Sequence, residues 1–232
     1  MAAEPPGTLL QGRFQQPLSY RFDLWRPAGP LRGPLLVCLH GYGQSKRASL
    51  AFGQRVRHGG PVAALQAPHP HHRRTEAGLR VGFSWVGAAE AGLYEPDEDL
   101  ANHHRFVQHV IARAHAEGLA AAPRAFLFGF SQSVSLNYRF AAAHPELLLG
   151  VIAVAGATPS AWERAAPRLG VPVLHIAPTD DEAYPRARAQ RFRERLAAAT
   201  DDLTWLEPPG GHRVPSACYP VMRRWLLERA RP

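Results

Sequence analysis

Cysteine, lysine and long apolar runs are scarce in this chain of 232 residues. Its two cysteines, Cys38 and Cys218, are too few for a disulfide framework, and we interpret them as structural thiols of a reducing compartment. No run of about 18 apolar residues occurs, as a membrane-spanning helix would need, and the opening "MAAEPPGTLLQGRF" lacks the basic and apolar regions of a signal peptide. We therefore expect a soluble, cytoplasmic protein that does not insert into membranes.

Positive charge is carried almost entirely by arginine, since Lys46 is the only lysine, and the formal net charge is +8. A basic balance of this kind can indicate a nucleic-acid partner. Here, however, the arginines of segments such as "RARAQRFRERL" and "MRRWLLERARP" are mixed with acidic residues, as on solvated helix faces. Because no RNA- or DNA-binding motif accompanies them, we predict no nucleic-acid partner.

Short apolar runs alternate with longer segments of helical period along the chain. The segments predicted to be strands are 17–27, 34–41, 62–68, 124–130, 150–157, 171–178 and 203–209. The segments predicted to be helices are 45–58, 97–117, 132–144, 185–199 and 214–230. With a hydrophobic content of 46%, this alternation predicts one α/β domain over residues 1–232, built on a mostly parallel, doubly wound sheet flanked by helices.

Residues 67–96 show no clear period, and a segment of that length without secondary structure is usually functional or disordered. We expect it to be a loop that covers a pocket. It contains a histidine-rich stretch, His69 to His72, and another histidine pair follows at His103 and His104. A metal site needs three or four convergent ligands, and no spacing here enforces that convergence. The sequence therefore predicts no metal site.

Ser131 lies in "GFSQS", between the apolar run of a predicted strand and the start of a predicted helix. On such a sharp strand-to-helix turn, a serine needs small neighbours at its −2 and +2 positions, which here are Gly129 and Ser133. Ser133 stands where glycine is usual, so the motif by itself also fits an ordinary turn. Ser131 can be interpreted as a nucleophile only if the chain supplies a base, an acid and an anion site.

A serine hydroxyl needs a base within hydrogen-bond reach, and the base needs a carboxylate that fixes its tautomer. His212 stands in "PPGGHRVP" after the last predicted strand, and Asp180 and Asp181 follow the preceding strand. Taken alone, each fits a surface histidine in a glycine loop or an acid in a turn at least as well. Together they give the chain order serine, aspartate, histidine that is expected for this architecture. The residues themselves leave the acid open between Asp180 and Asp181.

A tetrahedral intermediate also needs hydrogen-bond donors for its oxyanion, and backbone N–H groups held in a turn can supply them. The segment "LHGYGQS", Leu39 to Ser45, follows a predicted strand, and its glycines allow close backbone approach. We predict that the N–H groups of Tyr42 and of Gln132, the residue after the serine, form this anion site. The same segment also serves as a glycine turn between a strand and a helix.

The motifs "LHGYG", "GFSQS", "DEAYP" and "GGH" together resemble the phospholipase/carboxylesterase family of α/β-hydrolases, which includes small bacterial carboxylesterases and acyl-protein thioesterases. The resemblance covers roughly Pro17 to Leu227 and implies an α/β-hydrolase fold without a large cap domain. In that family the catalytic acid commonly precedes a proline by four positions, which implies Asp181, because Pro185 follows it at that spacing. Ser133 in place of glycine and the histidine-rich stretch depart from the family pattern.

These residues predict a serine hydrolase that cleaves carboxylic esters of small molecules through an acyl-enzyme, with Ser131, Asp181 and His212 as the triad and with no cofactor. The same triad would also serve an acyl-thioesterase or a lysophospholipase, because specificity depends on the shape of the pocket. Outside catalysis, the alternative is an inactive binding protein on a hydrolase fold.

The pocket is expected to be open and shallow, because the chain has no room for a cap. Trp85 and Tyr42 are predicted to cover the acyl or alcohol group, with Phe83 and Tyr94 as further aromatic candidates. Such a pocket buries few methylene groups, so we expect a preference for short to medium acyl chains.

Overall fold

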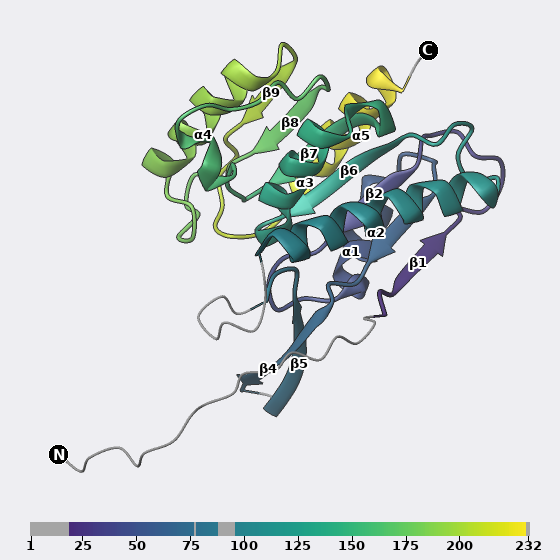
Figure 1. Cartoon of the computed structure of the whole chain (residues 1–232), viewed down its shortest axis with the longest axis horizontal. Helices are drawn as coiled ribbons and strands as arrows, with labels where there is room; N and C mark the ends of the chain where they lie inside the picture. The colour runs from purple at the N-terminus through teal and green to yellow at the C-terminus, as the bar shows by residue number, and fades with distance from the viewer. Residues whose placement is uncertain (1–18, 77, 88–95, 231–232) are drawn as a thin grey trace, which may run out of the picture.

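The computed structural model describes residues 19–76, 78–87 and 96–230 (Figure 1). The strands of its main sheet are β1 (Phe22–Trp25), β2 (Leu36–Leu39), β3 (Val62–Leu65), β6 (Ala125–Phe130), β7 (Leu148–Val154), β8 (Val173–Ile176) and β9 (Leu203–Leu206). They lie in the order β1-β3-β2-β6-β7-β8-β9, with β1 antiparallel to β3 and the other neighbours parallel. Each strand overlaps one predicted from the sequence, which confirms the mostly parallel sheet.

Helices cover both faces of this sheet (Figure 1). The longer ones are α1 (Lys46–Val56), α2 (Pro96–Ala116), α3 (Gln132–Ala143), α4 (Arg186–Ala199) and α5 (Tyr219–Arg229), and the short 3-10 helices are η2 (Pro145–Leu147), η3 (Ser160–Glu163) and η4 (Ser216–Cys218). Helices α2, α3 and α4 pack on one face, and α1 and α5 pack on the other, which confirms the doubly wound α/β arrangement. Within the described ranges, no helix combines the length and apolar character needed to cross a bilayer.

The alternation of side chains along the central strands explains why there are two cores. On β2, Val37 and Leu39 contribute to the core under α2 and α3, whereas Leu36 and Cys38 contribute to the core under α1 and α5. All four side chains are fully buried. A strand buried on both faces has a continuous apolar sequence, and for this reason the central strands could be recognised from the sequence.

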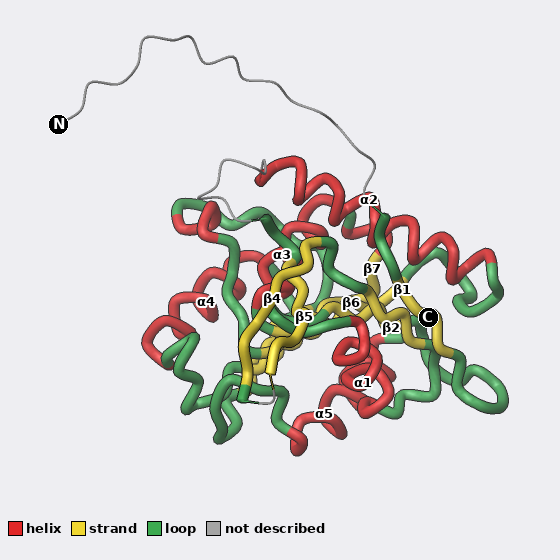
Figure 2. The backbone as a smooth tube through the Cα atoms, turned by 90° about the horizontal axis from the view of Figure 1, so that it is seen from below, coloured by secondary structure: helices red, strands yellow, loops and turns green. Residues whose placement is uncertain are grey.

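Much of the described part of the segment 67–96 is regular, contrary to the prediction of an irregular loop. This segment contains the antiparallel strands β4 (His69–Thr75) and β5 (Gly78–Ser84), which form a hairpin that projects from the main sheet (Figures 1 and 2). The outer part of β5 is exposed on both faces, so its sequence lacks the alternation that marks a half-buried strand. Residues 77 and 88–95, and with them Tyr94, lie outside the described residues.

The base of the hairpin is attached to two other segments. Gly43 donates its N–H to the Phe83 carbonyl at 3.0 Å, and Phe83 donates its own N–H to the Gln44 carbonyl at 3.1 Å. On the β4 side, His69 Nε2 lies 3.0 Å from Asp99 Oδ1 in the first turn of α2. The hairpin is therefore fixed both to the glycine turn after β2 and to α2.

Candidate active site

Ser131 occupies the sharp turn between β6 and α3. Its backbone angles are φ 54° and ψ −114°, a conformation that residues other than glycine rarely adopt. Its N–H donates to the Val154 carbonyl at 3.0 Å. Small neighbours are required, because a Cβ on Gly129 would lie 2.7 Å from Asn137 Nδ2 and a Cβ on Gly156 would lie 2.8 Å from the Ser131 carbonyl oxygen. This strained turn holds the serine at the carboxyl end of β6.

His212 and Asp181 form a hydrogen-bonded chain with Ser131. His212 Nε2 lies 2.9 Å from Ser131 Oγ, and Nδ1 lies 3.0 Å from each carboxylate oxygen of Asp181. Asp181 is 3% exposed, and its Oδ1 also accepts the N–H groups of Ala183 at 2.9 Å and Tyr184 at 3.0 Å. A histidine that donates Nδ1–H to the carboxylate presents Nε2 as an acceptor to the serine hydroxyl.

Asp180 points elsewhere, although it is adjacent to Asp181 in the sequence. Its Oδ2 accepts the N–H of Gly210 at 3.0 Å and the hydroxyl of Thr179 at 3.2 Å. Its backbone N–H donates to the Gly210 carbonyl at 2.9 Å. Asp180 thus fastens the loop after β9 that carries His212, whereas Asp181 faces the imidazole.

The glycine turn between β2 and α1 lies directly beside Ser131. A Cβ on Gly41 would come within 3.2 Å of Ser131 Cβ, so this close approach depends on glycine. Within the part of the chain that the structure describes, neither the N–H of Tyr42 nor that of Gln132 makes a hydrogen bond. Both N–H groups are therefore free to bind an external acceptor.

His40 supports this turn, a role that was not predicted from the sequence. Its Nδ1 lies 2.8 Å from the Gly41 carbonyl, its Nε2 accepts the N–H of Ala67 at 3.1 Å, and its carbonyl accepts the indole N–H of Trp85 at 2.7 Å. Burial lowers the pKa of His40 to about 4, so the ring is neutral and can donate from one nitrogen while it accepts at the other. A histidine directly after a buried strand was the only signal of this role in the sequence.

Trp85 is a core residue and not a wall of an open pocket, which corrects the prediction. Its side chain is 2% exposed and packs against the rings of His40 and His103. Burial is favourable because the large ring leaves water while its N–H keeps an acceptor. The backbone N–H of Trp85 donates to Gln132 Oε1 at 3.0 Å, and Gln132 Nε2 donates to Ser84 Oγ at 2.9 Å. These bonds fasten the end of β5 to the first residue of α3.

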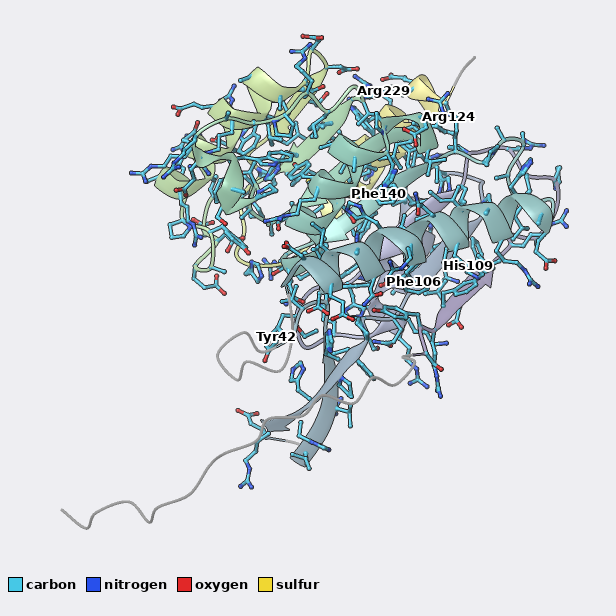
Figure 3. The ribbon with its side chains drawn as sticks, viewed as in Figure 1. Tyr42, Phe106, His109, Arg124, Phe140 and Arg229 are labelled. Atoms are coloured by element: carbon cyan, nitrogen blue, oxygen red, sulfur yellow. The ribbon has the colours of Figure 1, made fainter. Side chains whose placement is uncertain are left out.

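Tyr42, by contrast, lies at the surface near the base of the hairpin (Figure 3). Its side chain is 59% exposed, and its ring stacks on that of His71 with the centroids 4.5 Å apart. Among the described residues, the other large exposed apolar side chains are Leu79, Val81 and Val86. Exposed apolar surface is therefore concentrated on the hairpin and the segments next to it.

Tyr184 of the "DEAYP" motif is a further side chain at the site that was not predicted. Its ring centroid lies 5.7 Å from that of His212, and its hydroxyl lies near the Ser131 side chain. Burial raises the pKa of Tyr184, so the hydroxyl keeps its proton at neutral pH. A protonated phenol at this place can donate a hydrogen bond to the serine oxygen or to a group bound there.

The fold and the site together define a class of protein. A mostly parallel sheet between helices, with a serine, a histidine and an aspartate joined by hydrogen bonds where its strands end, is the arrangement of an α/β-hydrolase. The chain belongs to the phospholipase/carboxylesterase family, whose model matches residues 28–223. The resemblance found in the sequence is thereby confirmed.

Individual relatives agree with this family. Over 155 residues the chain is 32% identical to "Putative esterase NocK" of Nocardia uniformis subsp. tsuyamanensis, a match that covers 65% of this chain and only 40% of that relative. The fold is similar to that of the Bacillus cereus carboxylesterase, with a TM-score of 0.66 and 16% identity over 90% of this chain and 94% of that one. Acyl-protein thioesterase 2 of Zea mays has a TM-score of 0.64 and 18% identity, over 91% of this chain and 99% of that one.

Proposed function

We propose that the protein is a serine carboxylesterase that cleaves esters of short to medium acyl chain through an acyl-enzyme intermediate. The observation that carries the proposal is the 2.9 Å contact between His212 Nε2 and Ser131 Oγ, because it puts a base next to the hydroxyl. The buried carboxylate of Asp181 lies where it would stabilise the imidazolium that forms. This chemistry needs no cofactor.

In the first half of the reaction, His212 takes the proton of Ser131 while Oγ attacks the ester carbonyl carbon. The N–H groups of Tyr42 and Gln132 hold the oxyanion, and one such donor typically contributes about 2.7–4 kcal/mol. The alcohol then leaves with the proton from His212. In the second half, water gives a proton to the same histidine and attacks the acyl-enzyme, which releases the acid and restores Ser131.

The acyl or alcohol group is proposed to lie against the exposed ring of Tyr42, which belongs to the turn beside Ser131. An open surface of this kind buries few methylene groups, and each one is worth about 0.8 kcal/mol. The value of kcat/KM should therefore rise over short chains and then level off, when further carbons remain in water. Trp85 takes no part in this contact, since its side chain is buried.

The variant Ser131→Ala tests the nucleophile. We expect kcat for p-nitrophenyl esters to fall at least about 10³-fold, and labelling by a fluorophosphonate probe to disappear, with the fold intact. The matched control is Ser135→Ala, which replaces a half-buried serine of α3. This variant should keep both the esterase activity and the labelling by the probe. A Ser131→Ala protein that retains more than about a tenth of the activity would show that another group is the nucleophile.

A series of oxyesters and acyl-thioesters of graded chain length tests the substrate class. The highest kcat/KM is expected on short to medium oxyesters. A steady rise through long chains, or a preference for thioesters, would contradict this choice of substrate and leave the assignment of Ser131 standing.

A further inference from the structure

A large cavity lies between the C-terminal end of α1 and helix α5, and none of the residues proposed for catalysis lines it. The two helices pack side by side on one face of the sheet (Figure 2). The cavity has a volume of about 840 Å³, which is in the range of small-molecule binding sites. It is called the α1/α5 cavity below.

The wall of the α1/α5 cavity is rich in arginine. Arg55 and Arg57 come from the end of α1, and Arg223 and Arg224 come from α5. Arg224 lies 4.0 Å from Glu228, the one acidic residue in the wall among those that the structure describes. Within the same described ranges, Arg55, Arg57 and Arg223 form no ion pair with a carboxylate. The cavity therefore has an excess of positive charge.

His58, next to the α1/α5 cavity, and Arg57, in its wall, agree with an excess of positive charge there. Burial lowers the pKa of His58, and the positive charge of Arg223 lowers it further. Arg57 caps α1 in the left-handed conformation, with φ 52° and ψ 39°, where glycine is the usual residue. A side chain at such a position is strained, yet here it adds a guanidinium to the cavity wall.

Tyr219 supplies a neutral donor in the same wall and is 8% exposed. Its hydroxyl is buried and has no hydrogen-bond partner of normal geometry among the described residues. Burial raises the pKa of Tyr219, and the nearby Arg55 guanidinium opposes that rise, so the phenol stays protonated. A buried donor without an acceptor is unfavourable, and a bound acceptor would remove this cost. Pro220 and Leu227 add apolar surface to the cavity.

We propose that the α1/α5 cavity binds an organic phosphate, that is, a mono-, di- or triphosphate ester on an apolar or aromatic body. The planar guanidinium groups of Arg55, Arg57 and Arg223 match phosphate oxygens in bidentate geometry. The Tyr219 hydroxyl donates to a further oxygen, and the body of the ligand packs on apolar surface such as Leu227. An inorganic anion would leave that surface in water, so the organic part contributes to affinity.

Titration calorimetry with adenosine triphosphate tests the proposal on the full chain. We expect saturable binding at one site, and Arg223→Ala should weaken the affinity at least about tenfold, because a charge-assisted hydrogen bond is lost. Tyr219→Phe keeps the ring and should weaken binding about threefold or more. The matched control is Arg193→Ala, at an exposed position on α4, which should leave the affinity unchanged.

Inorganic pyrophosphate and glycerol 3-phosphate lack the aromatic body and should bind more weakly than adenosine triphosphate. Equal or tighter binding of either compound would overturn the proposal of an organic phosphate with an apolar or aromatic body. The absence of saturation at millimolar adenosine triphosphate, or an unchanged affinity in Arg223→Ala, would overturn the site itself. The titration does not depend on esterase activity, so the Ser131→Ala protein should give the same affinity.

Discussion

The hydroxyl of Ser133 lies 3.1 Å from the carbonyl oxygen of Leu39 and so joins α3 to the end of β2. The same hydroxyl oxygen accepts the N–H of Phe130 at 3.0 Å, and it lies 3.1 Å from the Phe130 carbonyl. Ser133 is fully buried. One side chain thus connects the strand before the glycine turn, the strand before Ser131 and the helix after it. The serine that departs from the family's usual glycine has a structural function.

Replacement Ser133→Ala should destabilise the protein, because the Phe130 N–H is left buried without its acceptor. We expect the free energy of unfolding to fall by about 1–3 kcal/mol, measured by urea unfolding followed by circular dichroism. Ser135→Ala in the same helix serves as the control and should change it by less than about 0.5 kcal/mol. Equal losses in the two variants would contradict the structural function of Ser133.

The two adjacent aspartates should differ strongly in their effect on catalysis. Asp181→Asn removes the carboxylate that faces His212 and should lower kcat by about 10²–10⁴-fold. Asp180→Asn is the matched control, since an amide oxygen can still accept the N–H of Gly210. Steady-state kinetics on one oxyester measures kcat for both variants. A larger loss of kcat in Asp180→Asn than in Asp181→Asn would move the role of the acid to Asp180.

Tyr184→Phe should reduce kcat about three- to tenfold with little change in KM, because the ring beside His212 stays and a hydroxyl that can donate a hydrogen bond near Ser131 is lost. Burial raises the pKa of Tyr184, so the wild-type enzyme should keep this contribution up to about pH 10, the ordinary pKa of tyrosine. The control is Tyr20→Phe, whose ring packs on Phe106 and is not part of the site. Equal kcat values in wild type and Tyr184→Phe would remove Tyr184 from the reaction.

His103 should make the stability depend on pH. Burial lowers its pKa to about 3, and its ring nitrogens have no hydrogen-bond partner among the described residues. Between about pH 6.5 and pH 3 the unfolded chain binds a proton here and the folded protein does not. The contribution of neutral His103 is therefore fully present above pH 6.5, and the free energy of unfolding falls by about 1.4 kcal/mol per pH unit below it.

His103→Phe keeps an aromatic ring in the core and should reduce this pH slope by about 1.4 kcal/mol per unit. Urea unfolding at several pH values between about 7 and 5 measures the slope. His115→Phe changes an exposed histidine of the same helix and should leave the pH slope of the unfolding free energy as in the wild type. An identical slope in wild type and His103→Phe would mean that His103 is protonated in the folded protein.

The strands and helices of the main sheet could be predicted because local sequence encodes which faces of an element are apolar. Strands β2 and β6 are buried throughout, so each is a continuous apolar run. The place of the candidate site followed from the same pattern. Parallel strands end at one edge of a sheet, so residues that follow β6, β8 and β9 come together there.

The hairpin β4–β5 and the place of Trp85 could not be predicted in this way. The outer hairpin meets solvent on both faces, and its position depends on close backbone contact, since a Cβ on Gly82 would lie 2.8 Å from the Gly43 carbonyl oxygen. In a segment without periodicity, the sequence does not indicate whether an aromatic side chain is buried in the core or exposed to solvent. Trp85 is buried because its large ring packs against His40 and His103, while the carbonyl of His40, 45 residues away, accepts its N–H.

By itself, the sequence determined the order of the helices and of the strands of the main sheet, and the presence of a serine, an aspartate and a histidine after successive strands. Only the tertiary structure decided which of the two adjacent carboxylates faces His212, because hydrogen bonds to Gly210 turn Asp180 toward the loop. It also brought the arginines of α1 and α5 into one cavity, since the two helices pack on the same face of the sheet. Periodicity is a local property of the chain, whereas contacts between segments far apart in sequence depend on how the elements pack.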